Sequence, residues 1–164
     1  MLAPFIGWRA CMLPLIALLL TTSPTANTKV TAAVCDIGRL ALRDLPAIDH
    51  NRGYARYYGN ADLKSGHLIA ACPALRAEIP QAFLLADDLA IDRASVHGPA
   101  QGQITPLTMV FEIGTPEISA DLKTATVEMG YICTGLCGAG FVAHYVNGPD
   151  GWRRDGEIRN TYGS

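Results

Sequence analysis

The chain has 164 residues, of which 17% are charged, and its formal net charge is −2 at pH 7. This length fits one domain and is sufficient to bury a hydrophobic core. Because acids slightly outnumber bases, the composition argues against a nucleic acid or an anionic membrane surface as the partner, since both require a basic face.

The first 26 residues have the composition of an export signal. Arg9 supplies a positive charge, residues 11–20 form a short apolar run that Pro14 interrupts, and residues 21–26 are small, as a signal peptidase requires. The apolar run is about half of the roughly 20 residues that a membrane-spanning helix needs. The segment therefore predicts a cleaved signal peptide rather than a retained anchor. Residues 27–164 are expected to form a single secreted or periplasmic domain with no stable membrane insertion.

A helix is predicted from Thr28 to about Leu45, where Pro46 follows. Charged residues occupy one side of this segment, and apolar residues recur along the other side at helical spacing. These apolar positions are Val30, Ala33, Val34, Ile37, Leu40, Ala41 and Leu45. Cys35 lies at the edge of the apolar stripe, a suitable position for a disulfide to a neighbouring element.

The next segments are less regular. Residues 49–65 predict a polar loop with an aromatic and basic cluster at 52–59, and a shorter helix is expected to begin near His67 and to hold Cys72. Residues 83–91 are apolar with Asp87 and Asp88 embedded, and they predict either a helix or a short strand. Turn residues predict a loop at 97–102.

Alternation with a period of two then predicts strands at 107–113, 124–133 and 141–146, with a turn at 114–123. A strong turn signal at 147–151 precedes a final edge strand, expected from Trp152 to about Tyr162. Helices first and strands last predict an α+β domain. In that domain, N-terminal helices pack on one face of a C-terminal antiparallel β-meander of three to four strands.

Four cysteines follow the signal: Cys35, Cys72, Cys133 and Cys137. An even number in an exported domain predicts two disulfides, with three possible pairings, and free or buried thiols are the alternative. Separation along the chain favours Cys35–Cys72 together with Cys133–Cys137. On a loop-closure basis, the long bridge stabilises the fold by about 4 kcal/mol and the short bridge by roughly 2 kcal/mol.

Residues 131–140 (YICTGLCGAG) hold three glycines around one cysteine pair. Glycine permits the tight chain reversal that a five-residue disulfide loop needs, so a disulfide-pinned turn is the favoured interpretation. A thioredoxin-type redox pair has two intervening residues, whereas Cys133 and Cys137 have three. A metal site at these cysteines needs two more ligands, of which His144 is the nearest candidate.

This segment, followed by Gly151 and Trp152, resembles the C-terminal hairpin of uncharacterised exported bacterial proteins. In those proteins a Leu-Cys-Gly-x-Gly turn precedes a Gly-Trp pair. The resemblance covers less than a third of the chain and implies that Trp152 packs back on the sheet, but it implies no activity. After Trp152 the chain departs from the pattern, because two arginines replace the expected apolar alternation.

No motif predicts an enzyme, because the chain lacks a nucleophile elbow, a phosphate-binding glycine loop, a calcium loop and a dinucleotide fingerprint. A non-catalytic binding or accessory domain of the cell envelope is therefore the leading hypothesis, with an envelope protein or a glycan as the partner. Aromatic and basic residues form its possible binding surface, for which a packed loop is the alternative. These residues are Arg52, Tyr54, Arg56, Tyr57 and Tyr58.

Two other functions remain open. A small envelope hydrolase or lyase would use Asp87, Asp88 or His97, although exposed or helix-capping acids are the commoner role for such aspartates. A metal or redox protein would use Cys133 and Cys137. The sequence predicts no cofactor and no metal ligand set.

Overall fold

The structure, a computed structural model, describes residues 26–49, 53–59, 66–96, 104, 106–135 and 137–163. The expected signal peptide lies outside these residues except for Ala26, which begins the first helix. The loop expected at 97–102, with His97, lies outside them too, as does Arg52. None of the described helices has the length and apolar character needed to cross a membrane.

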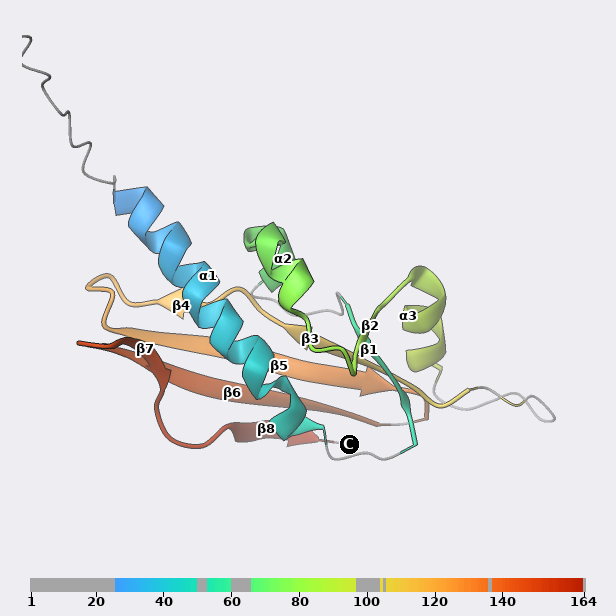
Figure 1. The fold of residues 1–164 in the computed structure, drawn as a ribbon. Coiled ribbons are helices and arrows are strands. Elements are labelled where there is room, and N and C mark those ends of the chain that lie inside the picture. Colours follow the sequence, from blue (N-terminus) through green and yellow to red (C-terminus); the bar gives the residue numbers. More distant parts are fainter. Residues whose placement is uncertain are drawn as a thin grey trace, which may run out of the picture.

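The first helix confirms the helical prediction for the N-terminal part of the domain. Helix α1 (Ala26–Asp44) continues into a short 3-10 helix, η1 (Leu45–Ile48), whose first turn contains the proline expected to end the run. Most of its apolar stripe is buried or half-buried, with Ile37 and Ala41 fully enclosed, whereas residues 28–32, Val30 included, are exposed. Figure 1 shows α1 lying diagonally across one face of the sheet.

The described strands form one mixed sheet in the order β2-β1-β3-β5-β6-β7, with β4 beside β5 and β8 beside β6. Their bounds are β1 (Ala55–Tyr58), β2 (Leu84–Leu85), β3 (Thr108–Ile113), β4 (Glu117–Ile118), β5 (Thr124–Cys133), β6 (Cys137–Gly148), β7 (Gly151–Arg154) and β8 (Arg159–Gly163). The predictions for β3 and β5 are confirmed. The expected last strand is instead two strands, which pair with different halves of β6.

The predicted fold is wrong. The expected arrangement was α+β, with N-terminal helices on a small C-terminal antiparallel meander. The N-terminal half instead contributes β1 and β2, and β1 pairs in parallel with both β2 and β3. One long helix therefore packs on a large mixed sheet of eight strands within the described part of the chain. Local sequence could not reveal β1, because its pairing partners lie in distant segments and strand preference depends on them.

The long β5–β6 hairpin forms the centre of the sheet, with continuous register from Thr124↔Val146 to Cys133↔Cys137. Alternate residues of these strands point toward α1 and are buried. Val127 and Met129 of β5 and Tyr145 of β6 belong to this core. The hydroxyl of Tyr145 donates a hydrogen bond of 2.9 Å to Asp44 at the end of α1.

The parallel corner of the sheet is covered on both faces. Between β1 and β2 the chain forms α2 (Leu68–Ala71) and the 3-10 helix η2 (Pro73–Glu78), both of which pack against α1. After β2 it forms α3 (Asp88–Ala94), which packs against β3 and β5. All six residues of β3 are buried, as expected for a strand with helices on each side.

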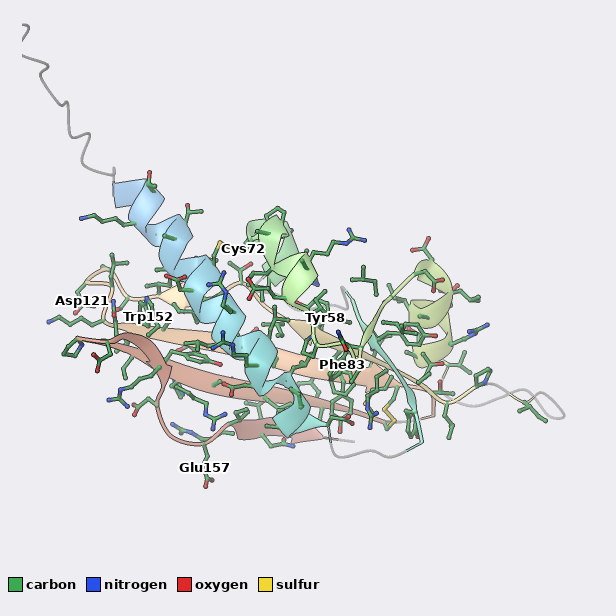
Figure 2. The ribbon with its side chains drawn as sticks, viewed as in Figure 1. Tyr58, Cys72, Phe83, Asp121, Trp152 and Glu157 are labelled. Atoms are coloured by element: carbon green, nitrogen blue, oxygen red, sulfur yellow. A yellow bond between two sulfur atoms is a disulfide. The ribbon has the colours of Figure 1, made fainter. Side chains whose placement is uncertain are left out.

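Two disulfides confirm the pairing that chain separation favours. Cys35–Cys72 joins α1 to the junction of α2 and η2 with a Cα–Cα distance of 5.6 Å. Cys133–Cys137 closes the tip of the β5–β6 hairpin with a Cα–Cα distance of 5.3 Å. Trp152 of β7 is half-buried and packs against the core, next to α1 (Figure 2).

Candidate functional site

A pocket of about 290 Å³ lies at the carboxyl ends of the parallel strands. Tyr58 and Leu85 are the last residues of β1 and β2, and Gly59 and Ala86 directly follow them. Side chains of α2 and η2 complete the wall. The described lining residues are Tyr58, Gly59, His67, Ile69, Ala70, Arg76, Leu85 and Ala86.

The sheet topology gives a physical reason for a pocket at this edge. From β1 the chain crosses to β2 through α2 and η2, and from β2 it crosses back past β1 to β3 through α3. The two crossovers therefore leave the strand ends in opposite directions, on different faces of the sheet. In sheets with parallel strands, ligands bind in crevices beyond the carboxyl ends of the strands, which is where this pocket lies.

Tyr58 is the most informative residue of this pocket. Its side chain is 1% exposed, and its hydroxyl has no hydrogen-bond partner among the described residues. Burial, with a smaller contribution from the carboxylate of Glu112, raises the pKa of the Tyr58 phenol, which therefore stays protonated near neutral pH. A buried polar group without a partner costs about 1–3 kcal/mol of folding free energy. Figure 2 shows Tyr58 beneath α2.

His67 contributes an imidazole with a defined tautomer. Its Nε2 lies 2.8 Å from the carbonyl oxygen of Gly59. A carbonyl oxygen only accepts, so Nε2 carries the hydrogen, and Nδ1 is an acceptor in the neutral ring. The ring centroid lies 5.6 Å from that of Tyr58. A backbone bridge from His67 to Gly114, directly after β3, holds this wall against the third parallel strand.

Arg76 brings a positive charge to the mouth of the pocket. Its side chain is exposed, and it forms no ion pair with a described residue. The acid of the same 3-10 helix, Glu78, is instead bonded to Arg39 of α1 at 2.7 Å. Hydrogen bonding to Arg39 holds the pKa of Glu78 below its ordinary value, which keeps this pair ionised.

The remaining wall is apolar. Ile69, Ala70, Leu85 and Ala86 surround the polar groups, and none of the described lining residues is an acid. A Cβ atom at Gly59 would lie 2.6 Å from the Cβ of Ala86, so glycine is needed for the two strand ends to approach each other here. The pocket therefore combines an apolar wall, a buried hydroxyl, an imidazole and an unneutralised guanidinium.

The described aromatic and basic residues that were predicted to form one binding surface lie in different environments. Along β1 the side chains alternate, so Tyr58 is buried and enters the pocket, whereas Tyr57 lies on the other face beside β2. Arg56 forms an ion pair with Asp49. Tyr54 is half-buried and packs against the core. Only Tyr58 of the described members reaches the pocket.

The residues of the two enzyme hypotheses lie elsewhere. Asp87 caps α3, with its Oδ1 accepting a 2.8 Å hydrogen bond from the amide of Ala90, and Asp88 occupies the first turn; both are exposed. Such positions favour acids through capping and the helix dipole. Cys133 and Cys137 are bonded to each other. Within the described ranges, no three His, Cys, Asp or Glu side chains come together in a way that could hold a metal ion.

Sequence reasoning missed most of this pocket. His67 was expected only near a helix start, and Arg76 carried no prediction. The pocket combines side chains from four segments, β1, α2, η2 and the end of β2, and no spacing within one segment indicates that they meet. The available signal was the alternation of Tyr57 and Tyr58, which is informative only once β1 is known to be a strand.

Comparison of the chain with protein-family models, with curated proteins and with solved structures found no match.

Proposed function

We propose that this chain is an exported, disulfide-bonded binding protein that holds a small ligand in the pocket at the ends of β1 and β2. One observation carries the proposal: Tyr58 lines the pocket, and its buried hydroxyl has no hydrogen-bond partner among the described residues. A ligand atom that reached this hydroxyl would recover part of the free energy that folding loses there.

The other lining groups suit recognition. Pockets for small molecules are mostly apolar, with a few polar groups that fix the orientation of the ligand, and this wall has that composition. The His67 ring is held by its hydrogen bond to the carbonyl of Gly59, so it presents a fixed edge. Groups whose positions are set before binding lose little conformational entropy on binding.

Binding without catalysis is the better-supported form of the proposal. The hydrogen on Nε2 of His67 is already bonded to a backbone carbonyl, and the phenol of Tyr58 has a raised pKa that makes it a weak acid. These properties favour holding a ligand over transferring a proton to or from it. The aspartates at the start of α3 serve that helix instead.

Export is the second part of the proposal. It is supported by the signal-like composition of residues 1–26 and by the two disulfides, which form and persist outside the reducing cytosol. Intact-mass measurement on protein recovered from the periplasm or medium of expressing cells tests this part. We expect a chain that begins near Asn27 and lacks the four thiol hydrogens; full-length chain in the cytosol with reactive thiols would contradict export.

Ligand capture is tested by amide NMR of the purified mature protein with three fragments of similar shape: benzoate, benzamide and benzylamine. We expect at least one fragment to shift the amide signals of Gly59, Ala70 and Ala86, which lie together only at this pocket.

Two neighbouring residues of α2 provide a matched pair of variants. Ala70 lines the pocket and Ala71 does not, and both are exposed. Ala70→Trp is expected to fill the pocket and abolish the shifts, whereas Ala71→Trp adds the same bulk beside it and leaves them. Absence of binding by all three fragments, or equal binding by both variants, would refute the pocket as a ligand site.

A further inference from the structure

We infer that the ligand of this pocket is a small organic anion, with an acidic group that pairs with Arg76 and an apolar body that contacts the adjoining wall. This inference rests on the proposed binding function and specifies the chemistry of the ligand.

The charge balance at the mouth is the first argument. Arg76 is exposed at the pocket and forms no ion pair with any described residue. Its nearest acid in sequence, Glu78, is already bonded to Arg39 and forms no ion pair with Arg76. The described wall therefore presents a positive charge with no negative charge beside it.

The acids closest to the pocket in sequence point to the same conclusion. Asp87 follows Ala86 directly, but its carboxylate accepts a hydrogen bond from the α3 backbone and is not part of the wall. A cationic ligand would thus meet the Arg76 guanidinium and no carboxylate among the described lining residues; the Glu112 carboxylate, which raises the pKa of Tyr58, is buried outside this lining. A planar guanidinium instead matches the geometry of a carboxylate, with two parallel hydrogen bonds.

The hydrogen-bonding groups add a second argument. Burial raises the pKa of the Tyr58 phenol, so it stays neutral, and a carboxylate oxygen that reached this hydroxyl would accept a hydrogen bond from it. Tyr58 and Arg76 come from β1 and η2, on different walls of the pocket. One ligand that satisfies both must span the space between them.

Size and apolar contact define the remainder of the ligand. The volume of about 290 Å³ lies at the lower limit of small-molecule sites, which fits a fragment-sized compound. Ile69 and Leu85 face this space, and Leu85 is 46% exposed, so an apolar ring or chain would cover it. Inorganic anions, which lack an apolar body, are therefore expected to bind less tightly than aromatic or aliphatic carboxylates.

The test compares the affinities of benzoate, benzamide and benzylamine by NMR titration of the mature, disulfide-bonded protein. Benzoate and benzamide have nearly the same shape and differ in charge. We expect benzoate to bind at least about fivefold more tightly than benzamide, the factor that one exposed ion pair of about 1 kcal/mol gives. We expect benzylamine to bind most weakly. Raising the salt from 0.05 to about 0.5 M should reduce the preference for benzoate, because exposed charges are screened.

Three variants locate the source of the preference. Arg76→Gln should make the affinities for benzoate and benzamide equal, and Arg76→Lys should keep part of the difference. Arg153→Gln is the matched control, because Arg153 is also exposed and lies on β7, outside the pocket wall. It should leave both affinities unchanged.

The possible failures are distinguishable. If benzamide or benzylamine binds as tightly as benzoate, and Arg76→Gln changes nothing, the anion inference is overturned while the binding function stands. If none of the three fragments binds, both fail. If benzoate binds but its shifts map away from Gly59 and Ala86 and survive Ala70→Trp, this pocket is not the anion site.

Discussion

The hydroxyl groups of two buried tyrosines should have opposite effects on stability. Tyr58 is 1% exposed and Tyr145 is 0% exposed, but among the described residues only Tyr145 has a partner for its hydroxyl, the carboxylate of Asp44 at 2.9 Å. Replacement of each tyrosine by phenylalanine removes one oxygen and preserves the ring. The pair therefore compares a satisfied hydroxyl with an unsatisfied one in the same core.

The expected magnitudes follow from the contacts. Tyr145→Phe loses a hydrogen bond to a charged acceptor, which is worth about 1.5–3 kcal/mol. The expected loss is near the lower value, about 1.5 kcal/mol, because Asp44 keeps its 2.7 Å hydrogen bond to Arg154 and so retains a partner. Tyr58→Phe removes an unsatisfied buried hydroxyl and should raise the free energy of unfolding by about 1 kcal/mol. The two variants should then differ by about 2.5 kcal/mol, or roughly 8 °C in Tm for a domain of this size.

The assay is urea unfolding of the ligand-free mature protein, followed by circular dichroism, with the m-value as the control for an unchanged unfolding reaction. Fragment titration on the same samples provides the second readout. We expect Tyr58→Phe to gain stability and to lose affinity for benzoate, whereas Tyr145→Phe loses stability and retains affinity. If Tyr58→Phe is destabilised as much as Tyr145→Phe, its hydroxyl is satisfied in the free protein, and the main support for the pocket as a ligand site is lost.

Three further predictions concern stability. Burial raises the pKa of both Tyr58 and Tyr145, so both phenols stay neutral in the fold while the unfolded chain ionises them above about pH 10. The free energy of unfolding should therefore not depend on the ionisation of these two tyrosines below about pH 10 and should fall above it by about 1.4 kcal/mol per pH unit for each tyrosine. Urea unfolding at pH 9–11 measures this slope, which the double phenylalanine variant should lack. Gly38→Ala should lower Tm through the loss of about 1–3 kcal/mol, because its Cβ would overlap a side-chain methyl of Leu68 in α2; an unchanged Tm would mean that this methyl shifts without cost. Serine replacement of the Cys35–Cys72 bridge should lower the free energy of unfolding by about 4 kcal/mol and weaken benzoate binding. Serine replacement of the Cys133–Cys137 bridge should lower it by roughly 2 kcal/mol and leave benzoate binding intact. Equal effects of the two replacements on binding would contradict a role of η2 in holding the ligand.

The parts of the fold that were predictable are those whose signal is local. Helix α1 has apolar residues at helical spacing, and apolar and polar residues alternate along β5. The sequence of each segment therefore predicts which of its sides is buried. The two disulfides followed from chain separation. Strand β1 gave no such signal, because its four residues are aromatic or basic apart from Ala55 and only Tyr58 is buried. The fold class failed with it, since the parallel corner depends on β1.

The pocket was not predictable for the same reason. The role of Tyr58 depends on which residues surround it after β1 pairs with both β2 and β3. The charge of Arg76 matters because Glu78 is bonded to Arg39, a contact between residues 39 positions apart. Such relations are set by tertiary packing, and the sequence pattern around each residue does not contain them.

The cross-link between α1 and the start of η2 has a consequence for when the protein can act. It fastens the segment that carries Arg76 to the first helix, and it closes only where thiols are oxidised. A newly made chain that is still inside a reducing cell would hold that segment by weaker, non-covalent contacts. Under the proposed binding function, ligand affinity is therefore lower before this bridge closes than after it.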